Sequence, residues 1–142
     1  MKRATWILTI VTMALMPLLA TAQMGSAQKL TAQVPFEFIA GNQRIPAGAC
    51  VVQAANPFGT AVSIRSSNPK ISLFSMLLNG DTQKGTPVNA LLFHKYGDTY
   101  FLSGIKLAGS QSTYELPQGK AEAELRAQNV PATEEVVLAA LK

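Results

Sequence analysis

The most regular hydrophobic pattern in the chain is an alternation with a period of two residues. This alternation is clearest at 34–39, where Val34, Phe36 and Phe38 fall on one face. Period two with aromatic and β-branched content is typical of a strand. Clusters of glycine, proline and asparagine separate such runs and indicate tight turns. Besides 34–39, the runs predicted as strands are 49–55, 60–66 and 71–78.

The run 71–78 differs from the others because it is apolar at nearly every position. A strand without alternation is expected where both faces of a sheet are covered. Asn79, Gly80 and Asp81 follow it and are typical turn residues. The pattern therefore predicts a doubly covered strand that ends at Asn79.

The stretch 88–107 predicts a hairpin closed by Gly97 and Asp98, a two-residue loop with glycine first. Pairing about that loop sets His94 opposite Phe101 and Phe93 opposite Leu102. One face of the hairpin would then carry Ala90, Leu92, His94, Tyr96, Phe101 and Ile105. The other face would carry Leu91, Phe93, Tyr100 and Leu102. Because both faces are largely apolar, we expect the hairpin to lie inside a sandwich or a small barrel.

The C-terminal part contains strong helix formers. The segment 118–128 follows Pro117, which suits a first helical turn, and Pro131 lies just beyond its end. The segment predicts one helix at about 118–128. Residues 134–141 have both strand and helix formers, and we favour a final strand that joins the sheet.

Together these elements predict an all-β domain over residues 29–142. We expect seven or eight antiparallel strands in a sandwich or a small, partly open barrel, with one helix near the C-terminus.

The N-terminus has the features of a cleavable secretory signal peptide over residues 1–22. Lys2 and Arg3 precede an apolar stretch, and Ala20 and Ala22 are small residues at the positions that a signal peptidase reads. Cleavage before Gln23 would leave a polar linker, 23–28, and cleavage before Gln28 is the alternative. An uncleaved membrane anchor is disfavoured because the run is short for a span and a cleavage site follows it. We therefore expect an exported protein, periplasmic or extracellular, without a stable membrane span after cleavage.

The charge pattern argues against nucleic-acid binding. The full chain has 12 basic and 8 acidic residues, and two of the basic ones, Lys2 and Arg3, would leave with the signal peptide. The net charge would fall from +4 to about +2. The remaining basic residues are scattered singly, whereas nucleic-acid binding needs a clustered basic face.

Several segments, in this order, resemble a group of small exported bacterial all-β proteins of uncharacterised function. The similar segments are 34–38, 45–48, 93–102, 115–117 and the helix that follows. The resemblance implies an exported all-β domain with a late helix. It implies no activity, cofactor or catalytic residue.

Cys50 is the only cysteine, so the chain has no internal disulfide. Its apolar setting favours a buried, inert free thiol, with an intermolecular bridge or a reactive thiol as the alternative. A thiol enzyme would need Cys50 as nucleophile, His94 nearby and Arg44 or Arg65 for the oxyanion. That set is similar to the one used by sortase transpeptidases, and we rank it last because the sequence around Cys50 does not resemble their nucleophile strand.

His94 is the only histidine, so a histidine-rich metal site is excluded and no metal or cofactor is predicted. The candidate ligand-binding residues are His94, Tyr96 and Phe101, near the end of the predicted hairpin. Four carboxylates are expected to be solvated charges: Glu122, Glu124, Glu134 and Glu135. Aromatic residues could line an apolar pocket, although a filled core is favoured. They are Phe36, Phe38, Phe58, Phe74, Phe93, Tyr96, Tyr100 and Phe101.

No complete catalytic constellation is visible, so the sequence predicts a non-enzymatic binding or structural-interaction module. A carrier of a small apolar ligand is the alternative, and a Cys50/His94-dependent enzyme comes last. The expected partner is another envelope or extracellular protein or an apolar small molecule.

Overall fold

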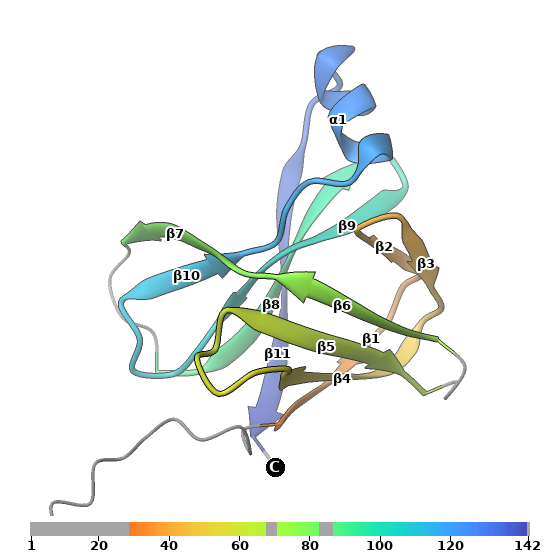
Figure 1. The fold of residues 1–142 in the computed structure, drawn as a ribbon. Helices are drawn as coiled ribbons and strands as arrows, with labels where there is room; N and C mark the ends of the chain where they lie inside the picture. Colours follow the sequence, from red (N-terminus) through yellow and green to blue (C-terminus); the bar gives the residue numbers. More distant parts are fainter. Residues whose placement is uncertain (1–28, 68–70, 83–86, 142) are drawn as a thin grey trace, which may run out of the picture.

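The computed structural model describes residues 29–67, 71–82 and 87–141, so the predicted signal peptide and linker lie outside the described residues. The structure is mostly β, a nearly closed mixed barrel with one short helix near the C-terminus (Figure 1). The predicted all-β class, in its barrel form, is confirmed. The described residues form eleven strands where seven or eight were expected, and the sheet is mixed, not purely antiparallel, because β2 pairs in parallel with β9. The elements are β1 (Lys29–Val34), β2 (Phe38–Ala40), β3 (Gln43–Ile45), β4 (Gly48–Ala54), β5 (Ala61–Ser66), β6 (Ser72–Met76), β7 (Leu78–Thr82), β8 (Asn89–Tyr96), β9 (Thr99–Lys106), β10 (Ser112–Glu115), α1 (Lys120–Ala127) and β11 (Thr133–Leu141).

Nine strands follow one another in the order β3-β2-β9-β8-β11-β1-β4-β5-β6. Outside this path, β10 pairs with β9 and with β7. Only Leu77 separates β6 from β7, and its N–H donates to the Thr60 carbonyl at 2.8 Å. At Leu77 the chain therefore passes from the edge of β5 to the edge of β10, which brings the sheet close to closure.

The predicted strand 34–39 is wrong as a single element. β1 ends at Val34 because Pro35 has no N–H to continue the ladder. The chain bends, and β2 begins at Phe38, where it pairs in parallel with Tyr100 on β9. The inward alternation itself is correct, because Val34 and Phe38 are both fully buried.

The predicted hairpin is confirmed, with one correction. Gly97 has a φ of 61°, which suits the first position of its tight turn, and His94 pairs with Phe101. Phe93 pairs with Leu102, but the neighbouring Leu92 pairs with Gly104. Ser103 therefore has no partner on β8 and is an extra residue in β9. Such a bulge reverses the alternation beyond it. Ile105 therefore lies opposite Leu91 in the barrel core and not on the face of His94, where the simple pairing placed it.

Aromatic and aliphatic side chains fill the inside of the barrel. Phe36 stacks on Tyr100 with ring centroids 3.7 Å apart. Phe93 meets both Phe36 and Phe38 edge to face at 5.1 Å. The largest fully buried side chains are Phe38, Phe93, Ile45, Ile64, Leu91, Val34 and Cys50. These contacts build the core from residues of both halves of the chain.

The C-terminal elements agree with the sequence. The helix α1 lies within the predicted range, and Asn129, with a φ of 56°, turns the chain out of it. The last segment is a strand, as favoured, because β11 inserts between β8 and β1 and pairs with both. Among the described residues no helix is both long enough and apolar enough to cross a membrane.

The prediction for 71–78 is wrong in two respects. The chain does not turn at Asn79, because pairing with β10 keeps β7 extended to Thr82. The segment is also covered on one face only. Phe74 is 73% exposed, Met76 60% and Leu78 51%, whereas Leu73 and Leu77 pack against the core.

Candidate functional site

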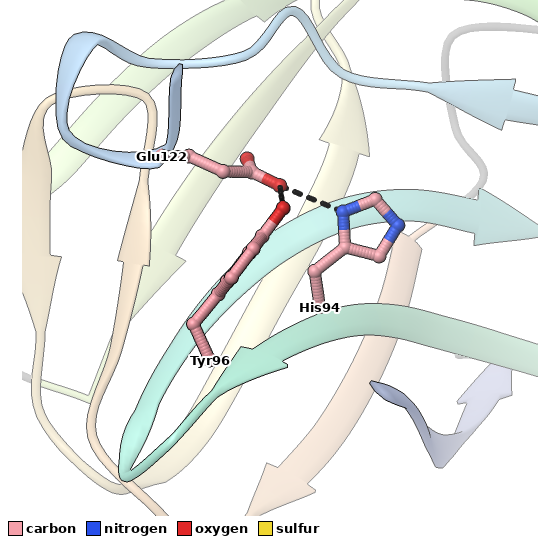
Figure 2. Close-up of polar contacts among 3 residues, drawn as sticks. All are labelled: His94, Tyr96 and Glu122. Carbon is pink, nitrogen blue, oxygen red and sulfur yellow. Dashed lines mark hydrogen bonds and ion pairs between the residues drawn. The ribbon is translucent and has the colours of Figure 1, made fainter. Parts of the chain in front are cut away.

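One end of the barrel carries a polar cluster of His94, Tyr96 and Glu122. His94 and Tyr96 are two residues apart on β8 and therefore share its outer face. The helix α1 lies over this face and points Glu122 at both side chains (Figure 2). The Nδ1 atom of His94 lies 2.7 Å from Oε1 of Glu122. The hydroxyl of Tyr96 donates to the same oxygen at 3.3 Å.

Glu122 is buried, at 3% exposure, so its prediction as a solvated charge is wrong. Glu124, Glu134 and Glu135 are exposed, as expected. A buried carboxylate is costly unless it is paired and hydrogen-bonded, and His94 and Tyr96 provide that compensation. The cluster therefore couples the outer face of β8 to the helix.

Tyr96 is a hydrogen-bond donor in the cluster. Burial raises the pKa of Tyr96, and the neighbouring charge and hydrogen bond of Glu122 raise it further. The phenol therefore keeps its proton. Phe101, which is also buried, packs its ring edge to face on Tyr96 with centroids 5.7 Å apart. Of the three predicted ligand-binding residues, only His94 is partly open to solvent, with 36% of its side chain exposed.

The turn between β2 and β3 provides a second attachment for α1. The Asn42 side-chain oxygen accepts a hydrogen bond from the backbone N–H of Lys120 at 3.2 Å. Gly119 lies so close to this turn that an added Cβ would collide with the Gly41 carbonyl oxygen. Asn42 therefore fixes the start of α1, and the cluster of His94, Tyr96 and Glu122 fixes its inner face. The cluster acts as an anchor for the helix. The sequence analysis did not identify Glu122 or Asn42 as site residues. The only sequence signal for Glu122 was that His94 and Tyr96, two polar side chains, share an otherwise apolar face of β8 and need a polar partner.

Cys50 and His94 lie on opposite faces of the sheet. Cys50 belongs to the buried core, and burial raises the pKa of its thiol to about 11. His94 faces outward, toward α1. Of the two candidate arginines, Arg44 lies on β3 and forms an ion pair with Glu37 at 2.7 Å. Arg65 lies on β5 and is exposed. The structure does not bring together the set that a thiol enzyme would need.

The eight aromatic residues considered as a pocket lining do not gather at one site. Phe58 and Phe74 are on the surface, at 85% and 73% exposure. Tyr96 and Phe101 lie on the outer face of the β8–β9 hairpin, on the side of α1. The remaining four pack within the barrel: Phe36, Phe38, Phe93 and Tyr100.

The strand β6 forms an edge of the sheet and has exposed apolar side chains. β6 ends the strand order, and β5 is its one strand partner among the described residues. The Ile71 carbonyl and the Leu77 N–H both bond toward β5. Because backbone groups alternate in direction along a strand, Ser72, Phe74 and Met76 direct their N–H and C=O groups away from β5. The side chains of Phe74 and Met76 on this strand are exposed. Figure 1 shows β6 at the end of the strand order, beside β5.

The other end of the strand order, β3, is a protected edge. It has three residues, and its Gln43 and Arg44 are polar and exposed. Short edges and edge charges prevent pairing with other chains. The five residues of β6 (Ser72–Met76) include no charge and no proline. Of the two strands that end the nine-strand order, only β6 retains the features that favour strand pairing.

In the described part of the chain, no group of three or more His, Cys, Asp or Glu side chains could hold a metal ion. The comparisons with known proteins add no family: no family model matches the chain, and neither a curated protein nor a solved structure is significantly similar to it.

Proposed function

We propose that this chain is an exported, non-enzymatic interaction module that binds an extended segment of a partner protein at the edge of β6. The observation that carries the proposal is the one-sided cover of the apolar run 71–78. Its sequence is that of a strand covered on both sides, yet Phe74 and Met76 are exposed in the isolated chain. A partner would supply the missing cover.

The backbone favours a polypeptide as the partner. The N–H and C=O groups of Ser72, Phe74 and Met76 point along the sheet, away from β5. The Met76 carbonyl already accepts a hydrogen bond from the Ser75 hydroxyl at 3.2 Å. An extended peptide added at this edge would bond to the outward backbone groups through its main chain, and its alternate side chains would pack on the neighbouring strand. The exposed ring of Phe74 and the exposed thioether of Met76 beside the edge add apolar area to the contact.

The proposal is tested with a synthetic peptide of alternating threonine and valine, seven residues long and blocked at both ends. The measurement is amide hydrogen exchange by NMR on the purified protein. We expect the amides of Ser72, Phe74 and Met76 to become protected when the peptide is added. The amide of Leu77, which already bonds to Thr60, should change little.

Two variants make this test specific. Phe74→Thr with Met76→Thr removes the apolar contact, and Ser72→Pro removes an edge donor at the first residue of β6, where proline is tolerated. Both should weaken the protection. Val136→Thr with Leu138→Thr is the matched control, because these exposed residues lie on β11, which has a strand on each side. Unchanged exchange at all three edge amides with saturating peptide would refute the proposal.

A further inference from the structure

A shallow groove of about 400 Å³ lies on the outer face of the sheet beside the β6 edge. It is lined by Lys29, Val51, Gln53, Arg65, Ser66 and Ser72. Arg65 pairs across the strands with Ser72 and with Val51, so the three side chains share a face. The groove thus connects an arginine on β5 to the first residue of the edge strand.

The groove is cationic. Lys29 and Arg65 are exposed, and neither forms an ion pair with any described residue. The strands β4, β5 and β6 contain no acidic residue at all. The exposed acids of the described chain lie elsewhere, as in α1 and at the start of β11. A ligand in this groove would therefore meet two positive charges, with no acidic residue on the described strands that line it.

The spacing of the strands relates the groove to the edge. A strand added to β6 lies about 4.8 Å from it and roughly 10 Å from β5. The side chain of Ser72 is short, so it leaves room for Arg65 to reach over β6. An acidic side chain placed opposite Ser72 would extend over β6 from the other side and could reach the Arg65 guanidinium. A guanidinium can bind a carboxylate through two parallel hydrogen bonds.

We infer that the segment bound at β6 carries an acidic side chain opposite Ser72 and apolar side chains opposite Phe74 and Met76. This inference rests on the proposed function and names the chemistry of its partner. The partner segment has the pattern acid–x–apolar–x–apolar, with Arg65 as the main carboxylate contact and Lys29 as a second positive charge in the groove.

The experiment compares three blocked peptides by the protection of the edge amides. The first is Glu-Thr-Val-Thr-Val, the second has Gln in place of Glu, and the third has Lys. Each is also made in reversed order, because a parallel and an antiparallel partner place the acid at opposite ends. We expect the better orientation of the Glu peptide to bind about three- to fivefold more tightly than its Gln form, as one exposed ion pair allows. The Lys peptide should be the weakest.

The Arg65→Gln variant should abolish the preference for Glu over Gln while leaving the binding of the Gln peptide unchanged. Lys106→Gln, on β9, is the matched control that removes one positive charge elsewhere. The preference should also shrink at high salt, because exposed charges are screened. If Glu and Gln peptides bind the edge equally, the inference is wrong and the proposed function stands. If none of the peptides protects the edge amides, the proposed function itself fails.

Discussion

The Nδ1 atom of His94 lies 2.7 Å from the Oε1 atom of Glu122, and this contact joins a barrel strand to a helix 28 residues later in the chain. The same oxygen accepts the Tyr96 hydroxyl, so one buried carboxylate fixes α1 to the outer face of β8. The contact stabilises the end of the barrel where the β8–β9 hairpin turns.

Glu122→Ala should loosen α1. It leaves the buried Tyr96 hydroxyl without its acceptor, which costs about 1–3 kcal/mol of unfolding free energy. Glu122→Gln should cost less, because an amide oxygen can still accept from Tyr96. Chemical denaturation measures the loss, and amide exchange in α1 locates it. Glu124→Ala, on the exposed side of the same helix, is the control, and an equal loss in that variant would contradict the anchor role.

The two side chains of this pair should not act independently. We expect the combined variant His94→Ala with Glu122→Ala to lose less stability than the two single changes added together, by about 1 kcal/mol. The reason is that each single change leaves the other group without its partner. A double-mutant cycle in urea gives this coupling. Additive losses would mean that the contact adds nothing to the stability of the helix.

Alkaline pH should destabilise the protein through Cys50. Burial raises the pKa of this thiol from 9.0 to about 11. Because the folded pKa is above the unfolded one, the stabilisation is complete below pH 9 and is lost as pH rises to about 11. This rise of the pKa from 9.0 to about 11 corresponds to about 3 kcal/mol of unfolding free energy. The slope of unfolding free energy against pH should flatten in Cys50→Ala.

Tyr96 acts in the same direction at high pH, because its pKa is also raised. Tyr96→Phe therefore separates the two contributions in the same titration. A Cys50→Ala slope identical to that of the parent between pH 9 and 11 would contradict the buried position of the thiol.

Phe93 and Phe74 should respond very differently to truncation. Phe93 is fully buried among Phe36 and Phe38, so Phe93→Ala should cost about 3–5 kcal/mol. Phe74→Ala removes an exposed ring and should change stability by less than about 0.5 kcal/mol. Thermal or urea unfolding of the two variants makes the comparison. A large loss in Phe74→Ala would show that the exposed edge supports the isolated fold and does not wait for a partner.

Gly119 should not tolerate a side chain. An alanine Cβ there would collide with the backbone carbonyl of Gly41, so α1 or the β2–β3 turn must move. We expect Gly119→Ala to cost about 1–3 kcal/mol, as overpacking does. The loss should appear together with faster amide exchange at Lys120, whose N–H bonds to Asn42. Gln118→Ala, at the preceding exposed position, should be neutral.

The sequence determined the elements whose signals are local. Glycine before Asp98 set the hairpin turn, and the helix formers after Pro117 set α1. Burial of Cys50 also followed from its apolar neighbours. These features depend on residues within a few positions of one another, so pattern and propensity are sufficient to predict them.

Only the tertiary structure decided which faces are covered. The bulge at Ser103, which moves Ile105 into the core, comes from the way β8 and β9 pair and leaves no mark in the alternation. The burial of Glu122 depends on α1 packing against the outer face of β8, a strand that lies far from it in the sequence. The open face of Phe74 and Met76 depends on how nearly the barrel closes. Each is set by contacts between distant segments, and no local sequence pattern records their geometry. The cluster around Glu122 and the exposed edge of β6 both arise in this way.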